Sequence, residues 1–407
     1  MHRIAVLILI FAAAAAANSP VVLQDFGIGN LDGGSSLYAG LVMDTAGNLY
    51  GAAEEGGIYN AGVVYELSRN TGGGWTETVL YNFTGANRGQ DGANPHATLL
   101  RDSAGNLYGT TVSGGIASRT CSKGCGVVFK LTPSGDTWQE TVLYRFTGGA
   151  DGSVPYAGVS MDAAGNLYGA ATSGGATAGV VYELTPGTPG WTEAVIHTFE
   201  DVDGATPYGT PVLDAAGNLF GTTYAGGAYN RGVVYALTPS AGAWTFHALH
   251  NFRGSPDGAN TLTGVILGPR GTLFGTTTSG GTASCGIAYE LAFKKSAGWT
   301  ETILHTFLGV GAADGENPNG LILDAHGNLF GTSTGGGLYN PGTIFELSPM
   351  AGGGWQETVL YSFTAGLDGA YPSSSLTLGP SGHLFGTTLW GGPSGDTTGG
   401  VAFEFTP

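Results

Sequence analysis

One five-residue pattern, Gly-x-Leu-aromatic-Gly, recurs along the whole chain and constrains its fold more than any other feature. Successive copies begin 52 to 60 residues apart. The seven copies are Gly47–Gly51, Gly105–Gly109, Gly165–Gly169, Gly217–Gly221, Gly271–Gly275, Gly327–Gly331 and Gly382–Gly386. Repetition at such a period is typical of an array of similar structural units.

Each unit carries the signals of four short strands, as residues 95–146 illustrate. We expect these strands at Ala97–Arg101, Leu107–Thr111, Gly126–Thr132 and Trp138–Phe146. An Asp-Ser-Ala-Gly-Asn turn joins the first two, and the third is rich in Val and Phe, which favour strands. Four antiparallel strands per unit describe a propeller blade. The sequence therefore predicts an all-β fold, a seven-bladed β-propeller of four-stranded blades.

The N-terminal segment has the pattern of the strand that the last unit lacks. The seventh unit stops after Ala402–Phe405 and has no Trp-x-Glu-Thr-Val-Leu-Tyr strand of its own. The segment Val21–Phe26 matches the pattern of Val79–Phe83. We therefore predict that the N-terminal strand supplies the fourth strand of blade seven and closes the ring, which removes open sheet edges.

The first residues have the layout of a secretory signal peptide. A short basic start, Met1-His2-Arg3, precedes an apolar run over Ile4–Ala17 and then small residues. We expect residues 1–17 to be a signal peptide and residues 18–407 to form a single propeller domain. The apolar run is short for a membrane span and no comparable run follows, so we expect no membrane anchor and a secreted or periplasmic/extracellular location.

Composition limits the partners of such a fold. Hydrophobic residues make up 42% and aromatic residues 11% of the chain, which excludes a disordered, low-complexity polymer despite 75 glycines. The formal net charge of −17 repels phosphate backbones, so nucleic acid is excluded as a partner. Cations and neutral ligands such as glycans suit this surface, and we expect a monomer.

Two segments carry a family resemblance. Asp214–Thr223 with Gly226–Pro239, and Asp162–Pro186, resemble the tandem GloVer-type repeat of exported bacterial "choice-of-anchor" proteins. The Leu-x-x-Asp-x-x-Gly-Asn-Leu-Tyr core is also similar to NHL-type propellers. The resemblance covers nearly all of residues 21–407 and implies an exported binding scaffold without catalytic residues. Such proteins often carry a C-terminal anchor; none follows blade seven here, which favours release.

The position that opens the first strand of each unit varies more than its surroundings. Its occupants are Tyr38, His96, Tyr156, Tyr208, Leu262, Asn319 and Ser373. We expect them at the mouth of the central channel, with aromatic or imidazole rings crowded in blades one to four. There they could bind a sugar or small polar ligand, or they could plug the channel by bonding to one another or to water.

Trp390 also departs from the repeat. The other six tryptophans open fourth strands, whereas Trp390 falls in the loop after the second strand of blade seven. Two interpretations remain: Trp390 packs locally, or it is a ligand platform beside blade one and Tyr38.

An Asp-Gly pair stands in the loop before every blade. The seven aspartates are Asp32, Asp91, Asp151, Asp203, Asp257, Asp314 and Asp368. Several carboxylates could hold Ca²⁺, with Asp91, Asp151 and Asp203 as the metal candidates. Recurrence in all blades favours a structural role instead, in which each Asp caps its own turn. We therefore expect no cofactor, with Ca²⁺ as the alternative.

The cysteines and histidines indicate mainly structural roles. Cys121 and Cys125 lie close together in an insertion, and we expect a disulfide there in an oxidising compartment, with Cys285 left free. His197, His250 and His305 replace Tyr81, Tyr144 and Tyr361 in fourth strands, so we interpret them as structural.

No Ser/His/Asp arrangement, phosphate loop or zinc-protease motif occurs in the sequence. We therefore expect a non-catalytic, exported binding propeller. Its ligand would be a glycan or partner protein, bound on the face formed by the loops between blades and the loops after the second strands. The alternative is a secreted metal-assisted hydrolase or lyase acting on carbohydrate in the channel mouth, built around His96 and the loop carboxylates.

Overall fold

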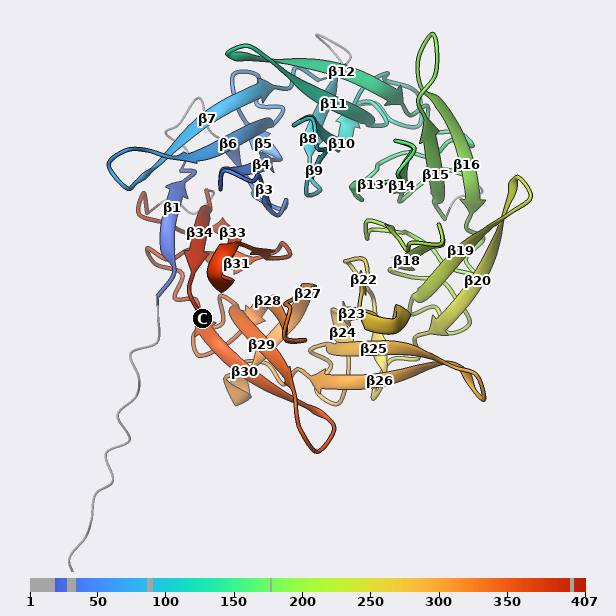
Figure 1. Ribbon diagram of the computed structural model, residues 1–407, viewed down its shortest axis with the longest axis vertical. Coiled ribbons are helices and arrows are strands. Elements are labelled where there is room, and N and C mark those ends of the chain that lie inside the picture. Colours follow the sequence, from blue (N-terminus) through green and yellow to red (C-terminus); the bar gives the residue numbers. More distant parts are fainter. Residues whose placement is uncertain (1–18, 28–33, 86–90, 176–177, 396–398) are drawn as a thin grey trace, which may run out of the picture.

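A computed structural model describes residues 19–27, 34–85, 91–175, 178–395 and 399–407. The signal peptide expected at residues 1–17 lies outside this range. Seven antiparallel blades are arranged in a ring (Figure 1), so the prediction of an all-β, seven-bladed propeller is confirmed. The described chain contains no α-helix, and its helical turns are η1 (Pro269–Gly271), η2 (Val310–Ala312) and η3 (Pro380–Gly382).

Each blade runs from an innermost strand to an outer strand, and the innermost strand is the shorter of the two in most blades. The innermost strands are β3 (Val42–Met43), β8 (Gly92–Pro95) with β9 (Leu100–Arg101), β13 (Val159–Met161), β17 (Val212–Leu213), β22 (Ile266–Leu267), β27 (Gly315–Leu323), and β31 (Ala370–Pro372) with β32 (Thr377–Leu378). The second strands are β4 (Leu49–Ala53), β10 (Leu107–Gly114), β14 (Leu167–Ala171), β18 (Leu219–Thr223), β23 (Leu273–Thr277), β28 (Leu329–Gly336) and β33 (Leu384–Trp390).

The outer half of each blade is more regular. The third strands are β6 (Val63–Arg69), β11 (Val127–Ser134), β15 (Val180–Thr185), β19 (Val233–Ser240), β25 (Ile287–Lys294), β29 (Thr343–Pro349) and β34 (Val401–Phe405). The outer strands are β7 (Trp75–Asn82), β12 (Thr137–Arg145), β16 (Thr192–Thr198), β20 (Ala243–Asn251), β26 (Gly298–Thr306), β30 (Trp355–Ser362) and β1 (Val21–Asp25).

Two kinds of loop share one face of the ring. Blade-connecting loops join an outer strand to the next innermost strand, and middle loops join second to third strands. The short pairs β2 (Gly34–Ser35) with β5 (Glu55–Gly56), and β21 (Gly258–Ala259) with β24 (Ser279–Gly280), hydrogen-bond one kind of loop to the other. This pairing confirms that the two kinds of loop lie together.

The expected strand boundaries of blade two were wrong mainly at the inner edge. Only Leu100–Arg101 of the expected strand Ala97–Arg101 pairs with β10, while a separate strand forms at Gly92–Pro95. The reason is local: Pro95 pairs with Thr111 and Leu100 pairs with Tyr108, so the four residues 96–99 lie opposite only the two residues 109–110 of β10 and bulge out of the ladder. The residues between β8 and β9 therefore line the channel instead of extending the ladder.

The ring closes through the N-terminal strand, as the sequence predicts. Strand β1 pairs antiparallel with β34, with Val21 opposite Glu404, so the first and last strands share blade seven (Figure 1). Phe26 is fully buried and Leu23 is 7% exposed, so this strand adds core as well as hydrogen bonds. Between blade one and blade seven, Arg69 and Glu404 form an ion pair of 3.1 Å.

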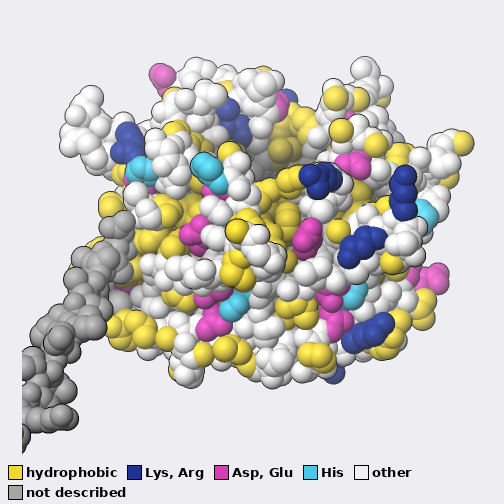
Figure 2. Space-filling model, turned by 60° about the horizontal axis from the view of Figure 1, so that its bottom comes forward, with side chains coloured by type: hydrophobic (Ala, Val, Ile, Leu, Met, Phe, Trp, Pro, Cys, Tyr) yellow, Lys and Arg dark blue, Asp and Glu magenta, His cyan; other side chains and the backbone are white. Residues whose placement is uncertain are grey.

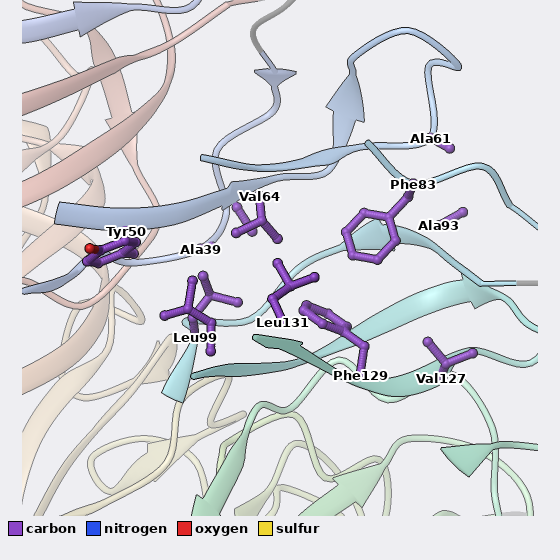
Figure 3. Close-up of a cluster of buried hydrophobic side chains, with 12 residues drawn as sticks. Ala39, Tyr50, Ala61, Val64, Phe83, Ala93, Leu99, Val127, Phe129 and Leu131 are labelled. Carbon is purple, nitrogen blue, oxygen red and sulfur yellow. The ribbon is translucent and has the colours of Figure 1, made fainter. Parts of the chain in front are cut away.

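The hydrophobic core is divided among the interfaces between neighbouring blades. Figure 3 shows the interface of blades one and two, where buried Val64 and Phe83 face Leu99, Phe129 and neighbouring residues. The ring centroids of Phe83 and Phe129 are 5.1 Å apart in an edge-to-face arrangement. Similar clusters recur around the ring, so each blade is stabilised mainly by its neighbours.

This packing explains both glycines of the repeat. The first glycine has a positive φ, as at Gly217 (+84°), where it ends the tight turn between the first and second strands. The second lies beneath an aromatic ring of the third strand. A Cβ at Gly221 would come within 2.3 Å of the Tyr235 hydroxyl oxygen, so no side chain fits there.

Candidate functional site

The seven variable residues that open the first strands meet in one cavity. Tyr38, His96, Tyr156 and Tyr208, together with Leu262, Asn319 and Ser373, all line a space of about 780 Å³ at the channel mouth. Figure 2 shows the ring obliquely, with the surface hollowed at the channel and hydrophobic side chains in the wall of the hollow. A volume of this size is within the range of small-molecule sites.

A repeated backbone turn aims these side chains inward. Two residues before each of them stands a residue with φ between 53° and 63°, and the full set is Ser36, Asn94, Val154, Thr206, Asn260, Asn317 and Tyr371. In six blades the N–H of this residue donates a hydrogen bond of 2.7–2.9 Å to a middle-loop carbonyl of the preceding blade; the N–H of Val154, for example, donates to the Cys125 carbonyl. The turn is held by the neighbouring blade, which maintains its unfavourable conformation.

Four rings from four successive blades form a continuous series, which we call the aromatic arc: Tyr38, His96, Tyr156 and Tyr208. Tyr38 stacks on His96 with centroids 4.6 Å apart. His96 meets Tyr156 edge to face at 4.8 Å, and Tyr156 lies 5.2 Å from Tyr208. Contacts of this kind stabilise the rings in fixed positions. The arc therefore offers a preformed apolar wall on one side of the cavity.

The phenol groups of the arc stay protonated. Burial raises the pKa of Tyr38, Tyr156 and Tyr208 above the usual value for tyrosine, and nearby groups, Glu54 among them for the first two, add to the effect. Within the described part of the chain, the Tyr156 and Tyr208 hydroxyls have no hydrogen-bond partner. These hydroxyls can therefore donate hydrogen bonds to a ligand.

On the opposite wall of the cavity the polar side chains are smaller, and their hydrogen-bonding groups already have partners. The Asn319 amide donates hydrogen bonds to Thr332 Oγ1 (3.1 Å), Thr334 Oγ1 (3.2 Å) and the Pro372 carbonyl (2.7 Å). The Ser373 hydroxyl donates to the Leu37 carbonyl at 3.4 Å. Asn319 therefore joins blade six to blade seven, and the free binding groups lie mainly on the aromatic arc.

Two further residues lie near the aromatic arc but do not occupy the variable position at which its four rings stand. Glu54 lines the cavity, with one carboxylate oxygen 3.5 Å from His96 Nδ1, and Tyr224 lies edge to face with Tyr208 at 5.8 Å. Both stand three residues after the second glycine of the repeat, where other blades have Val, Thr or Leu. That second variable position is the signal that could have identified them.

Trp390 lies outside this cluster. The residue ends strand β33, paired with Ala370, and not in a loop as expected, because the second strand of blade seven extends to meet β31. Its ring contacts Tyr371 edge to face at 5.0 Å and remains 49% exposed. The preceding Leu389 lines the cavity, whereas Trp390 does not.

The loop aspartates turn toward the outer strands. Asp91 accepts hydrogen bonds from the Tyr81 hydroxyl (2.9 Å) and from the Thr84 N–H (3.0 Å) and hydroxyl (2.7 Å). Asp151 accepts from Tyr144 and Thr147, and Asp203 contacts His197 and the Glu200 N–H. These bonds match the capping interpretation. Asp32 lies outside the described residues, and none of the described loop aspartates lines the cavity.

The three cysteines have separate surroundings. Cys121 and Cys125 form a disulfide with Cα atoms 5.1 Å apart, inside the middle loop of blade two. Cys285 is free and half-buried. Burial raises the pKa of its thiol, and the charges of Glu316 and Asp314 raise it further, which disfavours the reactive thiolate.

In the described part of the chain, His96 lies apart from the groups of possible metal ligands. Among the described residues, the groups of three possible metal ligands are His250 with Asp257 and Glu301, and His305 with Asp314 and Glu357, and neither group includes His96. Its one close acidic neighbour is Glu54. The arrangement suits ligand binding by ring contact and hydrogen bonding.

Solved structures of low sequence identity share the fold. The chain is similar to the extracellular domain of what is described as a one component system from B. thetaiotaomicron, at 10% identity and TM-score 0.52, over 94% of this chain but only 39% of that one. A Lactobacillus plantarum protein matches at 16% identity and TM-score 0.51 over 84% of this chain and 95% of that one.

A third structure, from Bacteroides uniformis and described as a 6-phosphogluconolactonase, matches at 14% identity and TM-score 0.50, over 79% of this chain and 84% of that one. At these identities the likeness shows the fold alone. No curated protein matches the chain. Within the described residues, no helix has the length and hydropathy needed to cross a bilayer.

A family model matches the chain itself. The Gloeobacter/Verrucomicrobia repeat matches residues 9–212, 115–313 and 213–407, three overlapping segments that together extend over nearly the whole sequence. The seven blades, the glycine pattern and the closed ring are thus the structure of such a repeat array. The chain belongs to the Gloeobacter/Verrucomicrobia repeat family.

Proposed function

We propose that the protein is an exported binding propeller that takes a carbohydrate against the aromatic arc at the channel mouth. One observation carries this proposal: four rings from successive blades are in unbroken contact along one wall of a 780 Å³ cavity. The face of a sugar ring packs its C–H groups on aromatic rings, while its hydroxyls exchange hydrogen bonds with polar groups. Tyr156 and Tyr208 offer both kinds of contact.

The charge of the cavity also favours an uncharged or cationic ligand. Glu54 is the one acidic residue among the described lining residues, and no Lys or Arg lines the cavity. Together with the net charge of −17, this disfavours phosphorylated or otherwise anionic ligands. A neutral or amino sugar therefore suits the site better than a sugar phosphate.

Binding to an immobilised glycan array, followed by titration calorimetry with the best glycan, tests this proposal. Tyr156→Ala should weaken the affinity at least 10-fold, which corresponds to about 1.4 kcal/mol. The matched control is Tyr339→Ala, which removes a tyrosine that is 62% exposed and lies outside the cavity. An array without a glycan ligand, or equal affinity in both variants, would contradict the proposal.

Trp390 distinguishes a small ligand from an extended one. Because its ring lies beyond the cavity rim and is half exposed, Trp390→Ala should leave a monosaccharide or disaccharide bound as before. A longer glycan or a partner protein that extends over blade seven would lose affinity in this variant. The same titration, repeated with oligosaccharides of increasing length, measures the reach of the site.

Export is the second part of the proposal. It is supported by the basic and apolar start of the sequence. N-terminal sequencing of protein recovered from the periplasm or medium of an expressing bacterium should give a start near Asn18. An intact Met1 on protein confined to the cytoplasm would contradict it.

A carbohydrate hydrolase or lyase is the second candidate function. The approach of Glu54 to His96 within the cavity favours it, because a carboxylate beside an imidazole can assist proton transfer. Product analysis by chromatography, with the glycans that bind, would show turnover that disappears in His96→Ala. Binding without products at any pH from 5 to 8 would reject this candidate.

A further inference from the structure

A polar group repeats between neighbouring blades, outside the channel. We call it the inter-blade trio: a Tyr or His near the end of one outer strand, the Asp of the following blade-connecting loop, and a Glu on the outer strand of the next blade. The trios are Tyr81–Asp91–Glu140, Tyr144–Asp151–Glu193, His250–Asp257–Glu301 and His305–Asp314–Glu357. The outer wall in Figure 2 shows His side chains lying beside acidic ones.

In the first His trio, all three potential ligand atoms converge. His250 Nε2 lies 3.3 Å from Asp257 Oδ2 and 3.7 Å from Glu301 Oε1. Two ligand atoms that each lie about 2.0–2.2 Å from one tetrahedral ion are themselves roughly 3.3–3.6 Å apart. Little movement would therefore place an ion among these three side chains.

The second His trio has the same form and a more buried aspartate. His305 Nε2 lies 3.0 Å from Asp314 Oδ2, and the ligand atoms of His305, Asp314 and Glu357 all lie within 4.8 Å of one another. The Asp314 side chain is only 8% exposed. Both trios offer one imidazole nitrogen and two carboxylate oxygens, a set that suits divalent transition metals such as Zn²⁺.

One oxygen in each His trio has no other partner. Glu301 Oε1 and Glu357 Oε1 are buried and accept no hydrogen bond from any described residue. The Glu oxygens of the Tyr trios, Glu140 Oε1 and Glu193 Oε1, are unpartnered in the same way, so the imidazole nitrogen is what distinguishes the His trios. A buried carboxylate oxygen without a partner is costly, and a bound cation would remove that cost. The aspartates are held in place by backbone donors: the Arg253 N–H donates to Asp257 at 3.0 Å, and the Leu308 N–H donates to Asp314 at 2.8 Å.

The other blades provide natural comparisons. In the Tyr trios a hydroxyl donates to the aspartate, as from Tyr81 to Asp91 at 2.9 Å, so a neutral donor stands where the imidazole ligand would be. Between blades three and four, His197 contacts Asp203 at 3.0 Å, but Phe246 replaces the Glu and stacks on His197 at 4.4 Å. Among the described residues, therefore, only the two His trios combine all three ligand types.

We propose that each His trio binds a divalent transition-metal ion, which clamps blade four to blade five and blade five to blade six. The site of His305 should bind more tightly than that of His250. Its aspartate is the more buried of the two, and the guanidinium group of Arg253 places a positive charge near Glu301 of the other trio.

Titration of metal-free, untagged protein with ZnCl₂ at pH 7.5 tests this proposal. We expect two Zn²⁺ per chain by calorimetry, with a rise in the melting temperature. His250→Tyr should reduce the stoichiometry to one, and His250→Tyr with His305→Tyr should abolish binding. Tyr is the residue that blades one, two and six carry at this position, so these variants keep a native contact. Glu301→Gln with Glu357→Gln gives a second route to the same loss.

The matched control is His197→Tyr, which removes an equivalent histidine from an interface without the Glu. It should retain two ions. Absence of Zn²⁺ binding up to millimolar concentration would overturn the proposal and leave a proton shared by each Glu–Asp pair as the stabilising element. Undiminished binding in the double His→Tyr variant would overturn it too, because the ions would then lie elsewhere.

Discussion

Replacing Glu140 by Gln should stabilise the propeller at pH 8.5 and leave its stability nearly unchanged at pH 5. Glu140 belongs to the Tyr81 trio, which lacks a histidine. Burial raises the pKa of its carboxyl group to about 7, and the charge of Asp91 adds to this, against a smaller opposite effect of Arg145. Because the folded-state pKa lies above the unfolded value, the stabilisation is complete below about pH 4.5 and is lost as the pH rises through about 7.

The size of the effect follows from the change in the pKa of Glu140. A pKa change from 4.5 to about 7 corresponds to a loss of about 3 kcal/mol in the free energy of unfolding, before screening by solvent is considered. The carboxyl group retains some contact with solvent, so screening reduces this to ~1.5 kcal/mol. The protonated acid resembles the amide of Gln, and the variant should therefore lack this part of the pH dependence.

Urea unfolding followed by tryptophan fluorescence, in the presence of EDTA, measures the difference. The free energy of unfolding of the wild type should fall by ~1.5 kcal/mol more than that of the variant between pH 5 and pH 8.5. The control Glu200→Gln, at an exposed position of a blade-connecting loop, should follow the wild type. Identical pH profiles for the wild type and Glu140→Gln would refute this reasoning.

Three further predictions concern the fold. Val154→Asn should raise the free energy of unfolding in urea by ~1 kcal/mol, because Val154 has a φ of +57°, which disfavours β-branched residues; a loss of stability would contradict it. Tyr235→Phe should leave urea stability unchanged or raise it by up to ~1 kcal/mol, because its buried hydroxyl has no described partner; a loss above ~1 kcal/mol would reveal a hidden hydrogen bond. Deletion of residues 21–27 removes the buried side chains of Leu23 and Phe26, whose burial stabilises the fold by about 4 kcal/mol, and exposes the edge of β34. The deletion should therefore lower the melting temperature and promote aggregation. Melting at the intact protein's temperature would refute ring closure by β1.

The sequence alone predicts the architecture because the same packing contacts recur in every blade. A glycine must lie under the third-strand ring, as Gly221 lies under Tyr235, and another must end the turn before it. These steric requirements recur seven times and make the period visible. The closing strand is predictable for a similar reason, since Leu23 and Phe26 repeat the apolar pattern of other outer strands.

The candidate site is only partly predictable. The position of the aromatic arc follows from the repeat, because one variable residue per blade must face the channel. The contact of Glu54 with His96, and of Tyr224 with Tyr208, depends on where the neighbouring strand ends, which the pattern does not specify. Trp390 was misplaced for the same reason, since the pairing of β33 with β31 lengthens that strand.

The sequence does not predict the inter-blade trios. His305 and Glu357 are far apart in the sequence, and they meet only because successive outer strands present facing surfaces. The histidines were correctly placed in outer strands, but their partners lie on the next blade. The sequence does carry a signal for the His trios, since blades four and five have His in place of Tyr and are each followed by a Glu in the outer strand of the next blade.

The most direct test of the proposed function is the affinity for the best glycan from an array, measured by calorimetry for the wild type, Tyr156→Ala and Tyr339→Ala. If the aromatic arc holds the ligand, Tyr156→Ala loses at least 10-fold in affinity, about 1.4 kcal/mol, while Tyr339→Ala binds as the wild type does. Equal affinity in all three proteins would place the ligand elsewhere and contradict a binding site at the channel mouth.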